Sequence, residues 1–412
     1  MDYRINPPDE IIETRVQLPL SKSMSNRALA IAALTEEGVA PIRISDCADT
    51  RIMADALAAP DGRIDIGAAG TAMRFLTAVM AATPGRRVIL DGSDRMRQRP
   101  VGPLVDALRE CGAQIEYECR RGFPPLAIEG RKLTGADVTM PAGTSSQFVS
   151  ALLMAGPTME RGLRLTLEGD AVSQPYIAMT VEMMRRAGAS VTRDGASYTV
   201  AAGGYRPVEQ EVEHDWSAAS YWYEIQALSS GFIGLDRLSR PSLQGDSACA
   251  DIFAALGVVT DFEGEDGLTD LSASPDLSPR LHLDMAATPD LVQTVVVTCC
   301  MLRVPFRLTG LGTLRIKETD RIDALCREML RLGVALTVDD GDVMWWEGHR
   351  VPVTEMPVFD TYDDHRMAMS LAPVSLYIPG IVIRHAEVVE KSYPGYWDSL
   401  RAAGFGIVEV QP

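Results

Sequence analysis

Apolar residues at helical spacing recur along the chain, and each such stretch ends near a glycine followed by β-branched or alternating residues. This change of pattern predicts a helix, a left-handed glycine cap and then a strand. The same junction occurs at intervals of roughly 70 residues, at Gly112, Gly188, Gly257, Gly333 and Gly404. Such junctions are common in any α/β protein, but their near-constant spacing indicates repeated α/β units. Residues 54–67 could form a shortened copy.

Three further segments refine this picture. The most apolar run, residues 291–302, contains Gln293 and is too short to span a bilayer, so it predicts a buried helix or strand. Residues 314–333 place dense charge before a helix with one apolar face. The polar stretch 211–217 precedes an apolar helix at 218–228. Because no long linker is present, we expect a domain boundary near 211–217.

Composition narrows the class of protein. The chain has 412 residues, 46% of them apolar and 23% charged, which favours a globular protein of more than one domain. Its net charge of −17 argues against nucleic acid or an anionic membrane as a partner. The 7 cysteines are scattered and odd in number, and no secretory signal is visible, which indicates reduced thiols in a cytoplasmic protein.

Several segments combine cations with predicted helix starts, where backbone N–H groups favour anions. Lys22, Ser23 and Arg27 open the helix after residue 21, although Ser is also a plain capping residue. Arg99 closes a run of three arginines, which could equally be a solvated charge run. In the segment 67–76, glycines permit close backbone approach to a ligand, with Thr71 as a candidate cap and Arg74 as anion support. A tightly packed junction explains that segment better when it is taken alone.

Uncharged donors and acid–base groups occur in other segments. Ser145, Ser146 and Gln147 open an apolar helix, and Ser173 precedes another; they can orient a hydroxylated ring or phosphate, or simply cap the helices. Asp290 heads the apolar run, where burial could tune its pKa for general base work, or it could be a capping acid.

The last third of the chain carries two more charged segments. Lys317, Glu318 and Arg321 crowd before a helix, and Arg366 and Lys391 lie further on. The chain has no GxGxxG loop, P-loop, HExxH or GxSxG motif, and the pair formed by residues 364 and 365 therefore suggests neither a metal site nor a catalytic triad. Anions are therefore expected to meet separate Arg/Lys segments and not one nucleotide cradle.

Taken together and in order, these segments resemble the 5-enolpyruvylshikimate-3-phosphate (EPSP) synthase family. The resemblance rests on SKSxSNR, AGTAMR, MRxRP, SSQF, SxPYI, DxSAASY, the TPD acid, RxKExDRI, DHRMAM and KSYP, which run from residue 21 to 397. It implies a two-domain inside-out α/β barrel, with three βαβαββ units in each domain and the active-site cleft between the domains. The domains would comprise 21–212, with a shortened first unit, and 1–20 plus 213–412.

The resemblance also implies the reaction. The enolpyruvyl group of phosphoenolpyruvate would pass to the 5-hydroxyl of shikimate 3-phosphate, through a tetrahedral intermediate and with release of phosphate, in aromatic amino acid biosynthesis. The protein would be a cytoplasmic monomer that needs no metal or organic cofactor and is inhibited by glyphosate. The implied alternatives are a UDP-N-acetylglucosamine enolpyruvyl transferase, whose Cys-bearing loop is not evident here, and a non-catalytic anion-binding homologue.

Site residues follow from the same resemblance. The catalytic groups would be Asp290, Glu318 and Lys22. The shikimate 3-phosphate ligands would be Lys22, Ser23, Arg27, Ser145, Ser146, Gln147, Ser173, Asp290 and Lys317. The phosphoenolpyruvate ligands would be Lys22, Arg99, Gln147, Arg321, Arg366 and Lys391.

The chain departs from the family pattern at several positions. Ala68, Phe75, Leu20 and Thr313 stand where the family usually has Asn, Pro, Gly and Asn. The stretch 49–67 is also shorter than usual. None of these differences removes a charged residue of the implied site, but Ala68 lacks an amide donor near it.

Overall fold

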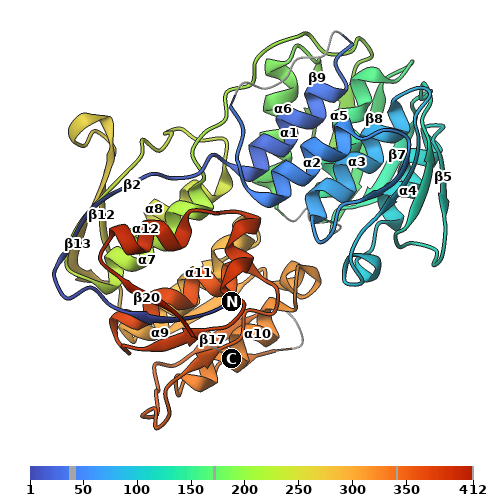
Figure 1. The fold of residues 1–412 in the computed structure, drawn as a ribbon. Helices are drawn as coiled ribbons and strands as arrows, with labels where there is room; N and C mark the ends of the chain where they lie inside the picture. The colour runs from blue at the N-terminus through green and yellow to red at the C-terminus, as the bar shows by residue number, and fades with distance from the viewer. Residues whose placement is uncertain (37–42, 144, 170–172, 340–341, 411–412) are drawn as a thin grey trace. The chain divides into compact units, whose positions relative to one another are not determined.

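The computed structural model describes residues 1–36, 43–143, 145–169, 173–339 and 342–410. The chain folds into two compact units. Leu20–Val212 form one, called here the inserted unit, and Met1–Pro19 with Glu213–Pro412 form the other, called the terminal unit. Figure 1 shows the ribbons of the two units.

The inserted unit contains two four-stranded sheets, in the orders β3-β4-β6-β5 and β7-β8-β10-β9. Its elements are α1 (Lys22–Ala33), α2 (Ala48–Ala58), β3 (Gly62–Asp65), α3 (Gly70–Ala82), β4 (Arg87–Asp91), α4 (Gly102–Glu110), β5 (Gln114–Tyr117), β6 (Leu126–Glu129), β7 (Asp137–Pro141), α5 (Ser146–Ala155), β8 (Leu163–Glu168), α6 (Gln174–Arg186), β9 (Val191–Asp194) and β10 (Ser197–Val200). Between residue 20 and β3, the described residues add α1 and α2 but no named strand.

The terminal unit contains three four-stranded sheets, in the orders β12-β13-β11-β2, β14-β15-β17-β16 and β18-β19-β1-β20. Its elements are β1 (Asp2–Asn6), β2 (Ile12–Val16), α7 (Trp216–Leu228), β11 (Gly231–Leu235), α8 (Cys249–Ala254), β12 (Leu256–Asp261), β13 (Thr269–Leu277), β14 (Leu281–Asp284), α9 (Val292–Leu302), β15 (Phe306–Thr309), α10 (Arg321–Arg331), β16 (Thr337–Val338), β17 (Met344–Trp346), β18 (Val358–Phe359), α11 (His365–Leu371), β19 (Ile381–Ile383), α12 (Tyr396–Ala402) and β20 (Gly406–Val410).

All five sheets share one pairing pattern. Each has a single parallel pair, such as β3 with β4, followed by two antiparallel pairs, such as β4 with β6 and β6 with β5. In the terminal unit, β2 pairs in parallel with β11, and β1 lies between β19 and β20. The N-terminal strands therefore complete two sheets whose other strands follow residue 212, and β1 pairs with strands from the end of the chain.

Four of the five predicted glycines follow the end of a helix. Gly112, Gly188, Gly257, Gly333 and Gly404 all have positive φ, from +73° to +97°. The left-handed backbone conformation costs little free energy at glycine, because glycine has no Cβ atom. The predicted helix ends are confirmed at Gly112, Gly188, Gly333 and Gly404, which follow α4, α6, α10 and α12. The prediction at Gly257 is wrong in its position, because α8 ends at Ala254 and Gly257 lies inside β12, where the strand register shifts.

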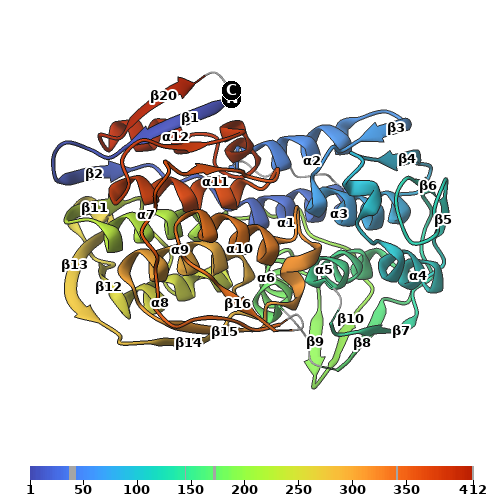
Figure 2. The same cartoon turned by 90° about the horizontal axis from the view of Figure 1, so that it is seen from below.

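Apolar helices form the interior of each unit. In the inserted unit, α3 is buried along nearly its whole length and contacts α1 and α5. In the terminal unit, α7 contacts α9, α9 contacts α11, and Figure 2 shows the strands of this unit at its periphery. The run 291–302, predicted as a buried helix or strand, is helix α9, and Gln293 is fully buried. No described helix is both long and apolar enough to cross a membrane.

One carboxylic acid lies in the apolar interior of the terminal unit. Glu224 on α7 is fully buried, and neither of its carboxyl oxygens has a hydrogen-bond partner among the described residues. Burial raises the pKa of Glu224 well above its usual value. Because the folded-state pKa is raised, the acid favours folding most at low pH, and this advantage is lost as pH rises through the folded-state pKa.

Replacing Glu224 by Met is therefore expected to stabilise the protein at alkaline pH. The unsatisfied buried polar group costs about 1–3 kcal/mol, which an unbranched apolar side chain removes. Calorimetric unfolding of both proteins at pH 5 and pH 8 tests this, and the advantage of the variant should be larger at pH 8. A lower unfolding temperature for the variant at pH 8 would contradict this account of Glu224.

Candidate functional site

The starts of three helices, α1, α5 and α6, carry predicted anion ligands of the inserted unit. Lys22 is the first residue of α1, and its Nζ lies 3.2 Å from Asp49 Oδ2 on α2. The side chains of Lys22 and Asp49 are 13% and 6% exposed, so this ion pair is largely desolvated. Ser145 and Ser173 are the residues before α5 and α6. Backbone N–H groups at such helix starts add to the field of the cations.

Arg27 connects α1 with α5 and α6. Its Nε donates to Thr180 Oγ1 at 2.6 Å, and its terminal nitrogens donate to Ser150 Oγ at 3.3 Å, Tyr176 O at 3.2 Å and Ser23 O at 2.8 Å. Burial lowers the pKa of Arg27 to about 10. The predicted phosphate ligand Arg27 is therefore engaged mainly by its own unit.

Phe75, one of the departures from the family pattern, packs against Arg27. The Cζ atom of Arg27 lies 5.3 Å from the ring centroid of Phe75 and 6.0 Å from that of Tyr176. Phe75 stands where the family usually has proline, and it is fully buried. Its ring therefore gives this chain a cation–π contact at Arg27 that a proline would not make.

Gly70 and Gln147 connect α3 with its neighbours. The guanidinium of Arg99 packs so closely against Gly70 that a Cβ atom there would lie 2.6 Å from one of its nitrogens. The Nε2 of Gln147 donates to Thr71 Oγ1 at 3.1 Å. Thr71 was a candidate helix cap, but α3 begins at Gly70 and Thr71 lies inside it, so that expectation is wrong.

Helix capping explains some of the hydroxyl positions and not others. Ser145 Oγ accepts from the backbone N–H of Gln147 at 3.3 Å, so Ser145 does cap α5, as the simpler alternative proposed. Ser146 is the first residue of that helix. Ser173 has a left-handed backbone, with φ +55°, and its side chain does not cap α6. Capping by its side chain therefore does not explain the place of Ser173 at this helix start.

In the terminal unit, a charged cluster surrounds Arg321, the first residue of α10. Its Nε donates to Asp364 Oδ2 at 2.7 Å, and its terminal nitrogens donate to Asp290 Oδ1 at 2.9 Å and Glu318 Oε2 at 3.1 Å. The Arg321 side chain is 2% exposed. These four side chains, with Lys317, Arg366 and Lys391, are called the terminal cluster.

The remaining cations of the terminal cluster contact the same acids. Arg366 on α11 donates to Asp290 Oδ2 at 2.8 Å. The Nζ of Lys317 lies 3.8 Å from Asp290 Oδ1, and that of Lys391 lies 3.5 Å from Glu318 Oε1. The structure thus brings four further predicted cations and acids, Lys317, Glu318, Arg366 and Lys391, around Asp290 and Arg321.

Cations dominate the electrostatics of Asp290. Burial favours a higher pKa for Asp290, but Arg366, Lys317 and Arg321 together hold that pKa well below its usual value. The sequence interpretation expected burial to tune this carboxyl, whereas the neighbouring cations decide its charge. Burial in turn lowers the pKa of Lys317, with Arg321 adding to the effect and Asp290 opposing it. The Asp290 side chain accepts from Arg321 and Arg366, and the residue directly before α9 is Leu291.

Sequence reasoning assigned no role to several partners of these residues. Asp364 precedes α11, bonds Arg321 and accepts from the Arg366 backbone N–H at 2.9 Å. Its place two residues before Arg366 was a usable signal for a helix cap. Asp49, Ser150 and Thr180 are far in sequence from the cations that they contact, and nothing in their local pattern marks them.

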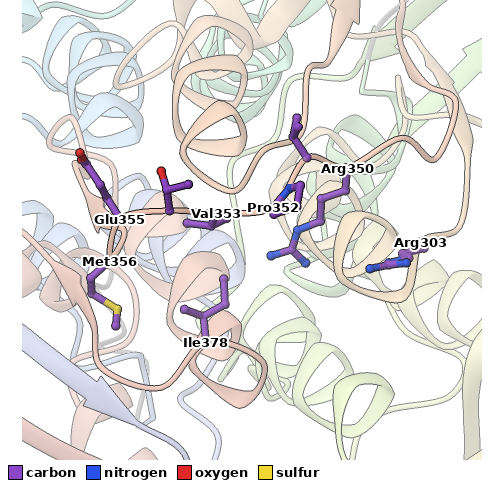
Figure 3. A pocket seen from close by; sticks show the side chains of 9 residues that line it. Arg303, Arg350, Pro352, Val353, Glu355, Met356 and Ile378 are labelled. Carbon is purple, nitrogen blue, oxygen red and sulfur yellow. The ribbon is translucent and has the colours of Figure 1, made fainter.

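A separate surface pocket of about 550 Å³ in the terminal unit contains none of the predicted ligands. Figure 3 shows the guanidinium groups of Arg303 and Arg350 with the apolar side chains of Met356 and Ile378. The Nε of Arg350 donates to Leu332 O at 2.9 Å. Burial lowers the pKa of Arg350, and Arg303 adds to this effect. This pocket is distinct from the terminal cluster.

Two α/β units, each with buried cations near helix starts, define a protein suited to binding small anions. A sequence model described as EPSP synthase (3-phosphoshikimate 1-carboxyvinyltransferase) matches residues 57–400. The chain belongs to this family of transferases.

Individual relatives agree with this assignment. A 3-phosphoshikimate 1-carboxyvinyltransferase of Bacteroides fragilis is 51% identical over 409 residues, which cover 99% of each chain. One from Thiobacillus denitrificans is 38% identical and covers 93% of this chain and 95% of its own. The EPSP synthase structure from Acinetobacter baumannii superposes with a TM-score of 0.76 at 20% identity, covering 99% of this chain and 100% of that one. The last comparison confirms the mixed α/β fold.

Proposed function

We propose that this chain transfers the enolpyruvyl group of phosphoenolpyruvate to the 5-hydroxyl of shikimate 3-phosphate and releases phosphate. Family membership supports the overall reaction, and the 51% identical relative carries the corresponding name. The observation that carries the chemistry is the terminal cluster. It holds a carboxylate, Asp290, between Arg321 and Arg366, beside Lys317 and a second acid, Glu318.

Phosphoenolpyruvate carries a phosphate and a carboxylate, and we assign the cations of both units to it. Arginine binds such groups with two parallel hydrogen bonds, whereas lysine acts as a compact charge. The proposed ligands are Lys22, Arg99, Gln147, Arg321, Arg366 and Lys391.

Shikimate 3-phosphate offers a phosphate and ring hydroxyls. Ser145, Ser146 and Ser173 are assigned to the 3-phosphate, because they lie at helix starts. Lys22, Ser23, Gln147, Asp290 and Lys317 complete the set, together with Arg27. Four of the five N–H groups of Arg27 are engaged within the described residues, so its direct share in the ligand is small.

The proposed reaction is an addition followed by an elimination. The 5-hydroxyl oxygen bonds to C2 of phosphoenolpyruvate and gives up its proton, while C3 gains a proton, which makes a tetrahedral adduct. C3 then loses a proton and the C2–O bond to phosphate breaks, which restores the double bond. Asp290 is assigned to the hydroxyl proton, and Glu318 and Lys22 to proton transfer at C3 and the phosphate oxygen.

The proposed ligands come from both units, so the reaction requires the two sets to act on the same pair of substrates. We assign residues 21–212 to one domain and 1–20 plus 213–412 to the other, each with the inside-out barrel arrangement of three βαβαββ units. Closure of the two domains on the substrates would exclude water from the reacting atoms.

Phosphate release from the purified protein tests the proposed function. Release that requires both shikimate 3-phosphate and phosphoenolpyruvate supports it. Calorimetric binding of both ligands without release would favour a non-catalytic anion-binding homologue. Release with UDP-N-acetylglucosamine in place of shikimate 3-phosphate would favour the other enolpyruvyl transferase.

Replacing Gly70 by Ala is expected to raise the KM for phosphoenolpyruvate about 10-fold, since a charged hydrogen bond is worth ~1.5–3 kcal/mol. The added Cβ would lie within 3 Å of the Arg99 guanidinium, which can move aside and leave its proposed ligand position. Steady-state kinetics measure the effect, and the same displacement should weaken competitive inhibition by glyphosate.

Gly143→Ala is the matched control for Gly70→Ala. Gly143 belongs to the same unit, but a Cβ there would have no neighbour within 4 Å. Its KM should match that of the wild type. An unchanged KM in Gly70→Ala would remove Arg99 from the proposed ligands.

A further inference from the structure

A buried acid lies behind Arg366, one of the proposed ligands of phosphoenolpyruvate. Asp246, in the 3₁₀ turn Gly245–Ala248, is 3% exposed and accepts a hydrogen bond from Ser217 Oγ. The same Ser217 oxygen accepts from a terminal nitrogen of Arg366 at 3.4 Å. Asp246, Ser217 and Arg366 thus form a chain of hydrogen bonds that reaches Asp290, to which Arg366 donates at 2.8 Å. All four residues belong to the terminal unit.

Hydrogen bonds connect the turn that carries Asp246 to the start of α7. The side-chain oxygen of Gln244 accepts from the Trp216 backbone N–H at 3.1 Å, and its Nε2 donates to His214 O at 2.7 Å. Asp215 caps α7 by accepting from the Ala218 backbone N–H at 2.8 Å. The Ser217 hydroxyl and the Asp246 carboxyl therefore face each other from two segments that are bonded together, which favours a fixed geometry.

The direction of the Ser217 proton follows from this arrangement. A hydroxyl has one hydrogen to donate and lone pairs to accept with. Because the carboxylate of Asp246 takes the hydrogen, the lone pairs of Ser217 remain for the guanidinium of Arg366. Arg366 also donates to Tyr221 OH at 3.3 Å. The Arg366 guanidinium therefore has acceptors both on α7 and at Asp290.

We propose that Asp246 is a positioning residue for the reaction: through Ser217 it fixes the orientation of the Arg366 guanidinium that receives the anionic group of phosphoenolpyruvate. This inference rests on the proposed function. Asp246 does not touch a substrate in this role. It acts by keeping the Ser217 hydroxyl in the accepting orientation toward Arg366.

The charge of Asp246 provides a second readout. Its carboxyl faces Asp215 and Ser217 of the α7 start, Asp290, Arg366 of α11 and Cys249 of α8. Burial raises the pKa of Asp246 to about 7, Asp290 and Asp215 add to this, and Arg366 and Ser217 oppose it. Below that pH the neutral carboxyl can itself donate to Ser217, which turns the hydroxyl hydrogen toward Arg366. Weaker phosphoenolpyruvate binding is then expected in acid.

The decisive experiment compares Ser217→Ala, Ser217→Thr and Ser220→Ala by steady-state kinetics in the full chain. Ser217→Ala should raise the KM for phosphoenolpyruvate about 10-fold with kcat within about twofold, because a lost binding contact acts equally on ground and transition states. Ser217→Thr retains the hydroxyl and should restore the KM. Ser220→Ala removes a buried hydroxyl of the same helix that donates to Ser217 O at 2.7 Å, and it should leave the KM unchanged.

The pH profile of Asp246→Asn completes the test. The ratio of the variant KM to the wild-type KM should fall as pH decreases from 8 to 6, because ionisation of the substrate itself is common to both proteins and cancels. If Ser217→Ala does not fold, Asp246→Asn still tests the positioning role. If the wild-type protein shows no turnover with the two substrates, both the proposed function and this inference are contradicted. Normal wild-type turnover with an unchanged KM in Ser217→Ala, or an equal rise in Ser220→Ala, would overturn the positioning role alone.

Discussion

Replacing Asp290 by Asn is expected to lower kcat by about 10²–10⁴, the usual share of a general acid or base. Asn has the shape of Asp and retains one acceptor oxygen, but it cannot take the proton of the 5-hydroxyl. Binding of shikimate 3-phosphate should persist, since the serines and Lys22 assigned to it lie in the other unit. Phosphate release and calorimetric titration of the ligand measure the two effects separately.

The proposed role of Asp290 as base requires its pKa to rise when the substrates bind. Both of its oxygens accept from arginines, Arg321 at 2.9 Å and Arg366 at 2.8 Å, and these cations keep its pKa low. In the proposed complex, the same guanidinium groups also bind the phosphate and carboxylate of phosphoenolpyruvate. That added negative charge raises the pKa of Asp290 toward the range useful for proton transfer.

Asp284→Asn is the control for this substitution. Asp284 is an exposed acid six residues earlier, and its side chain accepts from the Ala286 backbone N–H at 3.0 Å. Turnover of the Asp284 variant should equal that of the wild type. A kcat of Asp290→Asn within about threefold of the wild type would exclude Asp290 as the base, since even the low end of the expected loss is about 10²-fold.

Local sequence signals predicted the parts of the fold that depend on a few neighbouring residues. The glycines at helix ends, including Gly112 and Gly333, were predictable because only the left-handed conformation lets the chain turn there into the next strand. The pairing of β1 with β19 and β20 was not predicted, because it joins the two ends of the chain and no local pattern encodes such a partner.

In the candidate site, too, local patterns predicted some residues and missed those that only tertiary packing brings together. The dense charge before α10 predicted functional roles for Glu318 and Arg321, and in the structure Arg321 is buried among acids. The acid that Arg321 holds most closely, Asp364, lies 43 residues further along the chain. Asp246 lies in a short turn whose residues show no pattern, and only the folded chain brings it to Ser217. Ion pairs of this kind depend on tertiary packing, which hydrophobic periodicity does not report.

Replacing Arg321 by Met is expected to destabilise the terminal unit by about 3–5 kcal/mol, which is typical when one partner of a buried ion pair is removed. The side chain is 2% exposed and bonds Asp364, Asp290 and Glu318. Methionine is similar in length but offers no N–H group, so three carboxylates lose their shared cation. Carboxylate repulsion should then favour proton uptake, and the loss of stability should shrink as pH falls.

The matched control for Arg321→Met is Arg327→Met on the same helix. Arg327 is 62% exposed and pairs with Asp323 at 2.7 Å, a surface contact worth about 0–1 kcal/mol. Denaturant unfolding at pH 5 and pH 8 should therefore show a large, pH-dependent loss for Arg321→Met and little change for Arg327→Met. Equal, small losses in both variants would mean that the carboxylates around Arg321 find other partners, and that the terminal cluster does not depend on this arginine for its stability.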